Sequence, residues 1–375
     1  TDTYKNVHPK GGTGIQMLGK GGIVIRYNDI IGSDKHRFND VMEGTNNRGR
    51  DSGSIGPDAD VYGNMMIYSE DDSIELDGGQ MNVRVYYNRM EQSRCGVSTA
   101  PNTMGPSYIF YNQIVNLGGT YNNASGTAIK AGGSPDKVFG LQYYFNNTID
   151  SDATGPKNIS YGDSSEFHSV SRNNIFVTRI GSRVSFSNIY ADERDDNDYD
   201  LLGGGPYVVK EGDESHGIVG MPTYVDRDRG IYYLAEGSLG KASGIYIDNF
   251  TEIEKPDMGA YPSGDEKFQM PFRPVPMYAD VSYIQMKDKE EKEVTIQIGD
   301  IGEGHTYSIL KNRDFNWLDI LSENGTDNVS LSPNSIVKFK IKGDLSKCEF
   351  KEGKGLVLFR LENGYSVPIT VYCTR

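Results

Sequence analysis

Short runs of alternating apolar and polar residues recur along the first half of the chain. Each run ends at an asparagine, and an aliphatic residue follows. The runs are IVIRYNDI, DVYGNMMI, VRVYYNRM, SYIFYNQI, LQYYFNNTI and HSVSRNNIF. A period of two predicts β-strands, and the recurrence predicts one structural unit that is used several times.

The spacing of these asparagines predicts a solenoid. About 20 to 25 residues are enough for three short strands and their turns to close one coil around a core. Stacked coils would bring their asparagines to ~4.8 Å, where the side chains can bond one another as a ladder. We therefore predict an all-β chain with a right-handed parallel β-helix over residues 1–269, and a sandwich or propeller is the alternative. The asparagines are Asn28, Asn64, Asn88, Asn112, Asn146 and Asn173, at intervals of 36, 24, 24, 34 and 27 residues.

A second, smaller domain is predicted after a proline-rich linker at residues 270–278, MPFRPVPMY, which cannot continue a ladder of strands. Beyond it, short alternating strands separated by turn residues fill residues 279–375. Such spacing predicts a small immunoglobulin-like β-sandwich. Trp317, the single tryptophan, has apolar neighbours on both sides, so we expect it in the core of this domain rather than on a sugar-binding surface.

Composition agrees with this fold and narrows the function. The 375 residues include 45 glycines and 25 tyrosines, and only 36% are hydrophobic, which favours strands and turns over helices. A net charge of -14 argues against nucleic acid as a partner, since phosphate binding needs a basic surface. No apolar run is long enough to span a membrane, and the first residues lack the apolar core of a signal peptide, so we expect a mature, soluble chain or fragment. Cys348 and Cys373 share the smaller domain, where a disulfide and two free thiols are both open.

Four stretches carry a resemblance to a known family. They are EDDSIELDGGQMNVRVYYNRM, GPSYIFYNQIVN, VSRNNIF, and a closing segment SHGIVGMPTYVDRDRGIYYLAEGS that is followed by PDMGAYPSG. The chain resembles, over about residues 15–264, the right-handed β-helix proteins of the pectate-lyase-like superfamily, in particular those secreted by gut Bacteroidetes. In that family the closing segment is an apolar strand pair at the exit of the helix. The usual N-terminal coils and cap are missing, so the helix is expected to begin partway along.

Aligning the coils predicts which side chains share an outer face. A shift of 23 residues aligns EDDSIELD with SRCGVSTA and turns Ile74 and Val97 toward the core. The residue after each then points outward, and the pairs IQ, ME and IK of other coils extend the same column. The predicted column consists of Gln16, Glu43, Glu75, Ser98 and Lys130.

Two carboxylates of this column are the catalytic candidates for hydrolysis. Glu43 and Glu75 would lie ~5 Å apart in adjacent coils, close to the spacing in retaining glycosidases, and their repulsion would raise one pKa into the range of a general acid. A lyase would instead need a cation and a base, for which Lys130 is the candidate. Asp71 and Asp72, together with Glu75, are the expected ligands of a calcium ion.

Further basic residues are candidates for substrate contacts and for acid-base chemistry. Arg48 and Arg50 lie in NNRGRDSGSIGPDAD, an insertion that explains the interval of 36 residues. From it, the two arginines could reach over a groove that runs along the outer column and bind the substrate. His168 is the histidine that we would test first as an acid or base. The remaining expected substrate contacts are Arg84, Arg94 and Ser98.

Each of these assignments has a structural alternative. Asp71 and Asp72 also suit a turn that enters a strand, because aspartate bonds the nearby backbone. Glu75 and Lys130 also suit a solvated outer face, and His168 also suits a hydrogen-bonded position within a strand.

These observations predict an extracellular protein, secreted or held at the bacterial surface or in the periplasm, that meets a polysaccharide as a monomer. A polysaccharide lyase or a glycoside hydrolase is the leading expectation, and it rests on the fold resemblance more than on a complete catalytic set. The alternative is a non-catalytic β-helix that binds glycans or mediates adhesion, or the stalk of a larger secreted protein such as an immunoglobulin A protease.

Overall fold

The structure is a computed structural model of the chain. It describes residues 12–18, 20–32, 37–47, 55–117, 127–133, 140–151, 154–159, 167–178, 186, 192–205, 212–227, 231–261, 277–281, 283–299, 301, 303–311, 315–348, 351–362 and 366–375. The chain divides into two compact units. The first takes in the described residues up to 223 and those of 233–261, and the second takes in the described residues of 224–232 and those from 277 onward. Most of the predicted linker lies outside the described residues.

Three sheets build the first unit, and every strand pairing recorded in them is parallel. The six-stranded sheet contains β1 (Ile15–Gln16), β4 (Met42–Glu43), β7 (Asp72–Glu75), β10 (Cys95–Thr99), β13 (Thr127–Gly132) and β16 (Thr154–Ile159). The seven-stranded sheet contains β2 (Val24–Arg26), β5 (Asp60–Tyr62), β8 (Val83–Tyr86), β11 (Ser107–Phe110), β14 (Leu141–Phe145), β17 (His168–Arg172) and β19 (Asp196–Asn197). The eight-stranded sheet contains β3 (Asp29–Ile31), β6 (Met65–Ile67), β9 (Arg89–Glu91), β12 (Gln113–Val115), β15 (Thr148–Ser151), β18 (Ile175–Thr178), β20 (Leu201–Gly203) and β21 (Ile218–Val219).

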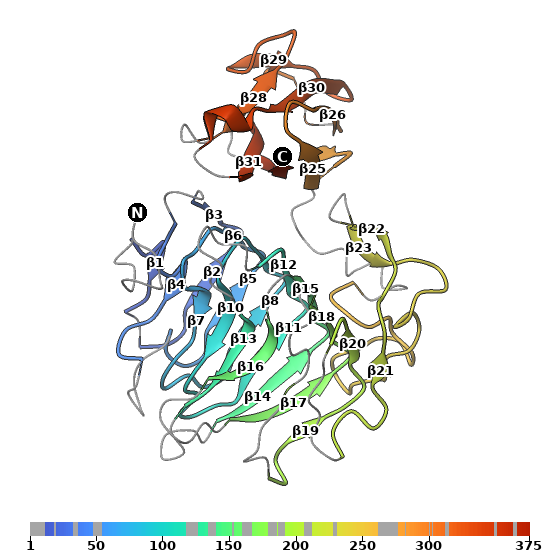
Figure 1. Cartoon of the computed structure of the whole chain (residues 1–375). Helices are drawn as coiled ribbons and strands as arrows, with labels where there is room; N and C mark the ends of the chain where they lie inside the picture. The colour runs from blue at the N-terminus through green and yellow to red at the C-terminus, as the bar shows by residue number, and fades with distance from the viewer. Residues whose placement is uncertain are drawn as a thin grey trace. The chain divides into compact units, whose positions relative to one another are not determined.

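The chain visits these sheets in rotation, and each turn of the chain adds one strand to each sheet. From β1 to β18 the order is six-stranded, seven-stranded, eight-stranded, and then the same again. Figure 1 shows the resulting stack, which runs from blue through green. The all-β prediction is therefore confirmed, and the stacked parallel sheets are consistent with a parallel β-helix.

Apolar side chains at equivalent positions of successive coils fill the space between the sheets. Ile74, Val97 and Ile129 pair in register and are fully buried, as the coil alignment predicts. The other two sheets add matching columns to the same core cluster: Val61, Val85, Ile109 and Tyr144, and Met66, Met90, Ile114, Ile149 and Phe176. This repeated burial stabilises the stack, because each coil covers the apolar edge of its neighbour.

An asparagine ladder runs along the corner between the seven-stranded and eight-stranded sheets. Each Nδ2 donates to the Oδ1 of the next residue at 2.8 to 3.0 Å. The same Oδ1 atoms accept the backbone N–H of the preceding ladder asparagine, and Nδ2 groups also donate to backbone carbonyls such as Val85 O. The ladder asparagines inside this corner therefore find hydrogen-bond partners for both their amide oxygen and their amide nitrogen. The ladder consists of Asn28, Asn64, Asn88, Asn112, Asn147, Asn174 and finally Asp200.

The predicted ladder is correct for its first four members and wrong by one residue for the last two. The residue before each ladder position has a positive φ, and in two coils that residue is also an asparagine, Asn146 (φ 50) and Asn173 (φ 59). Asparagine tolerates this conformation better than most residues, so an Asn-Asn pair offers two candidates, of which the second joins the ladder. The first of each pair instead binds the returning segment: Asn173 Nδ2 donates to Ile245 O, and Asn146 Nδ2 to Gly259 O.

The closing segment follows the three sheets, and most of its strand pair belongs to the second unit. Its apolar run forms a two-stranded sheet of β22 (Tyr224–Asp226) and β23 (Ile231–Leu234). Residues after β23 then return along the coils, where Ala260 N donates to Thr148 Oγ1 at 2.8 Å. Among the described residues, no helix has the length and apolarity to cross a membrane.

Two further sheets form the second unit, as its alternating sequence predicts. One is antiparallel and contains β24 (Met277–Ala279), β26 (Glu291–Ile298), β30 (Ile336–Gly343) and β28 (Leu318–Leu321). The other contains β25 (Tyr283–Lys287), β32 (Ser366–Thr374), β31 (Glu352–Leu361), β27 (His305–Lys311) and β29 (Val329–Leu331), with only the β25–β32 pair parallel. A short 3-10 helix, η3, covers Leu345–Lys347.

The second unit has its own core. Trp317 is 4% exposed, which confirms the prediction that it packs inside. A Cβ added at Gly353 would lie 2.7 Å from the Trp317 ring, so this glycine lets the indole lie directly on β31. Cys348 and Cys373 are both free thiols, which decides between the two alternatives left open by the sequence.

Candidate functional site

The predicted outer column is confirmed in register on the six-stranded sheet. Gln16 pairs with Glu43, Glu43 with Glu75, and Glu75 with Ser98. Ser98 then pairs with Lys130. Five consecutive coils therefore place their predicted residues side by side, as the alignment of the coils requires.

A second column of polar residues lies three positions earlier in these strands. Asp72 pairs with Cys95, and Asp72 N donates to Asp40 Oδ1 at 2.9 Å. We did not predict Asp40 as a site residue, although DVME at residues 40–43 repeats the pattern of DSIE at residues 72–75. Asp77, also not predicted, follows the first column, where its Oδ1 accepts from Ser98 Oγ at 2.5 Å and from Ala100 N at 2.7 Å.

This outer face is covered, although an open solenoid face would be exposed to water. Glu75 is 7% exposed, and Asp72 and Ser98 are fully buried. One of the residues that cover Glu75 is Asn47, whose Nδ2 donates to Glu75 Oε1. The alternative of a solvated outer face therefore does not describe Glu75.

Lys130 is the cation placed among the buried acids Asp71, Asp72 and Asp77. Its Nζ lies 2.5 Å from Asp72 Oδ2 and 3.8 Å from Asp71 Oδ1, and Arg94 Nη1 lies 3.9 Å from that same Asp71 oxygen. Burial alone would lower the pKa of Lys130, but the carboxylates of Asp72 and Asp77 outweigh it and raise that pKa well above its ordinary value. An ammonium held in this way is a poor base, so the geometry favours Lys130 as a fixed charge.

Three carboxyl groups come together where β4 and β7 lie side by side. Oxygens of Asp40, Glu43 and Glu75 lie within 4.8 Å of one another. Thr13 Oγ1 donates to Glu43 Oε1, and Asn47 Nδ2 to Glu75 Oε1, so each glutamate is oriented by a neighbouring donor. Glu43 is the more accessible of these two glutamates.

Desolvation raises the pKa of several of these carboxyl groups. Burial, reinforced by the nearby Asp77 and Asp40, raises the pKa of Glu75 to about 9. Burial also raises the pKa of Asp40 to about 7, with Asp71 contributing, and that of Asp77 to about 6. These shifts have the direction expected when more carboxyl groups than cations share a dry site.

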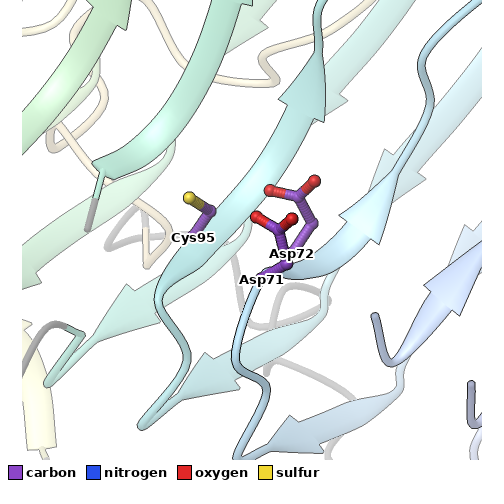
Figure 2. Close-up of side chains that lie close together, drawn as sticks. All are labelled: Asp71, Asp72 and Cys95. Atoms are coloured by element: carbon purple, nitrogen blue, oxygen red, sulfur yellow. The ribbon is translucent and has the colours of Figure 1, made fainter. Parts of the chain in front are cut away.

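The residues expected to bind calcium do not meet at one point. Oxygens of Asp71 and Asp72 lie within 4.8 Å of each other and of Cys95 Sγ, whereas Glu75 belongs to the group with Asp40 and Glu43. Figure 2 shows the two aspartates where the chain enters β7 and the cysteine on the neighbouring strand β10. Sulfur is a poor ligand for calcium, which prefers six to eight oxygens, so this group does not fit a calcium ion.

The structure does not bring every predicted residue to this face. His168 lies in β17 of the seven-stranded sheet, where Arg194 approaches Nε2 and Asp195 Oδ2 lies 2.8 Å from Nδ1. Arginine has only donors, so Nε2 accepts and Nδ1 donates to Asp195, which favours the structural alternative for this histidine. Arg84 is on that same sheet and binds Asp60 Oδ2 at 2.7 Å. Arg48 and Arg50 lie outside the described residues.

An aromatic column on the outside of the seven-stranded sheet is the other surface to consider for sugar binding. The ring of Tyr86 stacks on Tyr62 at 4.8 Å and 8°, and on Phe110 at 4.8 Å and 3°. A sugar ring stacks on an aromatic face, and both faces of Tyr86 are covered by its neighbours. The column therefore stabilises the coils and presents ring edges, which weakens the case for a purely glycan-binding surface here.

No protein-family model matches the chain, and no curated protein matches it.

Proposed function

We propose that the protein is a glycoside hydrolase that cleaves a polysaccharide beside Glu43 and Glu75. The observation that carries this proposal is the direct pairing of these two glutamates on adjacent strands, with their carboxylate oxygens within 4.8 Å of each other. Retaining glycosidases use two carboxyl groups that are about 5 to 5.5 Å apart, whereas inverting enzymes need a wider gap for water. The short spacing supports a retaining reaction.

The two glutamates suit different roles in this reaction. Glu75 is the more buried, and its raised pKa supports a general acid that keeps its proton for the leaving oxygen. Glu43 is partly exposed and oriented by Thr13, which supports the role of the nucleophile that attacks the sugar. Once the leaving group has departed, the ionised Glu75 would take the proton of the water that hydrolyses the glycosyl-enzyme.

The alternative of a polysaccharide lyase receives less support. A lyase needs a base for the C5 proton and a cation that neutralises the substrate carboxylate. Lys130 already pairs with Asp72, and Arg94 lies near Asp71. Among the described residues of this face, these two cations are therefore paired with acids of the protein and not placed to neutralise a substrate carboxylate.

The wider setting of the proposal follows from the fold and the sequence resemblance. We infer a right-handed β-helix of the pectate-lyase-like type, an immunoglobulin-like sandwich in the second unit, and an extracellular polysaccharide as the substrate. The stacked parallel sheets and the two mainly antiparallel sheets support these inferences.

The test is a screen of neutral, amino-bearing and uronic-acid polysaccharides for new reducing ends, with ultraviolet absorbance to detect unsaturated products. On a polymer that is cleaved, Glu43→Gln and Glu75→Gln should each reduce the rate by about 10² to 10⁴-fold. Glu293→Gln, an exposed glutamate of the second unit, is the matched control and should leave the rate unchanged. Proton NMR of the first product should show a retained anomer. A lyase also frees a reducing end, so unsaturated products that appear together with the reducing ends would support the lyase, and reducing ends without unsaturation support the hydrolase. No product from any polymer would remove the catalytic claim.

A further inference from the structure

The group of Asp71, Asp72 and Cys95 has a feature that the proposed hydrolysis does not use. All three side chains are buried, at 5%, 0% and 4% exposure, and their oxygen and sulfur atoms converge within 4.8 Å. In Figure 2 the two carboxylates lie beside each other, and the cysteine comes from the adjacent coil. Their convergence is fixed by strand pairing, because Asp72 is in register with Cys95.

One oxygen of the group has no hydrogen-bond partner. Asp72 Oδ1 is buried without a donor, while Asp72 Oδ2 lies 2.5 Å from Lys130 Nζ. A buried unsatisfied carboxylate oxygen is costly, and an ion is one of its ordinary explanations. The division of labour matches that of a metal-ligating carboxylate, in which one oxygen binds the metal and a second group holds the other oxygen.

We propose that Asp71, Asp72 and Cys95 bind one borderline-soft divalent metal ion of the zinc class. Two carboxylates and a thiolate are ligands that zinc and cobalt accept, and three protein ligands leave a fourth position for water. The group is too small and too rich in sulfur for calcium. Lys130 would act as the outer partner that fixes the orientation of Asp72.

The binding step balances without a further reactant. The Cys95 thiol gives its proton to solvent and the sulfur forms a bond to the metal, while the metal sheds water molecules and keeps its oxidation state. The two bound carboxylates and the thiolate offset the charge of the metal and of Lys130. The inference does not depend on the proposed hydrolysis, because the hydrolytic pair Glu43 and Glu75 is not part of this ligand group.

Cobalt(II) titration of the full chain tests the site, because a cobalt-thiolate bond gives a charge-transfer band in the near ultraviolet. We expect one cobalt ion per chain, the band, and release of a proton, both after prolonged incubation and after refolding with the metal. Cys95→Ser should abolish the band, and Cys348→Ser, the matched control in the second unit, should retain it. Asp72→Asn should weaken cobalt binding by about tenfold or more, and zinc should displace the cobalt.

Three results would overturn the proposal. They are no band from a folded chain with a reduced Cys95, a band that survives Cys95→Ser, and displacement of cobalt by calcium as readily as by zinc. Circular dichroism of each variant establishes that it is folded. If Asp72→Asn does not fold, Asp71→Asn replaces it, with the same loss of affinity expected.

Discussion

Lys130 Nζ lies 2.5 Å from Asp72 Oδ2, although 58 residues separate the two along the chain. They come from β13 and β7, which lie on either side of β10, so the lysine side chain spans a whole strand to reach its partner. Only 12% of the Lys130 side chain is exposed, and none of the Asp72 side chain. The pair therefore joins nonadjacent coils in a dry environment.

Lys130→Met should destabilise the first unit by about 3 to 5 kcal/mol, because it leaves a buried aspartate without its cation. Urea unfolding followed by far-ultraviolet circular dichroism measures the loss. The double variant Lys130→Met with Asp72→Asn should recover part of it. A loss in the double variant equal to the sum of the losses of Lys130→Met and Asp72→Asn alone would show that the pair is not coupled.

The asparagine ladder predicts opposite tolerances to one chemical exchange. Asn112→Asp removes the amide that donates to Asn147 Oδ1 and to Val85 O, and it brings an acid into a buried ladder. We expect a loss of about 2 to 4 kcal/mol from the unmade hydrogen bonds and the buried charge.

The reverse exchange, Asp200→Asn, occurs at the end of the ladder, where Oδ1 only accepts from Asn174. It should cost less than Asn112→Asp, about 1 kcal/mol, since the oxygen that accepts from Asn174 is kept and only the acceptor of Ser171 Oγ is replaced. Urea unfolding of the two variants compares them directly. A greater loss for the Asp200 variant would contradict the directional ladder.

The raised pKa values predict that stability falls as pH rises. Glu75 keeps its proton in the folded chain up to about pH 9, whereas the unfolded chain loses it near the ordinary value of 4.5. Between these limits the folded state binds more protons than the unfolded state, so the free energy of unfolding decreases with pH. Asp77, with a pKa of about 6, acts in the same direction at the acid end of this window.

Urea unfolding at about pH 5 and about pH 8 should therefore show the larger free energy of unfolding at the lower pH. Glu75→Gln, which cannot ionise, should flatten the decline. An unchanged slope in this variant would mean that Glu75 is ionised in the folded chain.

The contact between Trp317 and Gly353 predicts a graded response to added methyl groups. Gly353→Ala would place its Cβ 2.7 Å from the indole and should destabilise the second unit by about 1 to 3 kcal/mol through overpacking. Gly355→Ala, with its nearest contact at 3.1 Å, should cost less. Trp317 is the single tryptophan, so its fluorescence reports the unfolding of this unit. Equal costs would show that the indole is free to move aside.

Much of the coil geometry could be predicted from the sequence because it follows from local periodicity. Alternation fixes which side of a strand each residue faces, so aligning Ile74 with Val97 also aligns Glu75 with Ser98. Asp40 was missed because the alignment considered only the residue after each apolar position. Extending it backward by two residues would have found the aspartate shared by DVME and DSIE.

The environment of the column could not be predicted in the same way. Glu75 is covered by Asn47, which reaches it from 28 residues earlier, and no periodic pattern encodes such a contact. His168 and Arg84 were grouped with the site because of their chemistry, but the rotation of the chain through three sheets puts their strands in the seven-stranded sheet. The inserted segments vary the spacing of the strands from coil to coil, and this conceals the place of each strand in the rotation when only the sequence is read.

The ladder also has a built-in terminus. Every asparagine in it can accept from one neighbour and donate to the next, so a further coil inserted among them would find both partners. Asp200 can only accept, and the next coil has Gly217 at the matching position, since Ile218 pairs with Leu201. The exchange of one amide nitrogen for an oxygen thus marks where the ladder ends, one strand before β21 completes the eight-stranded sheet.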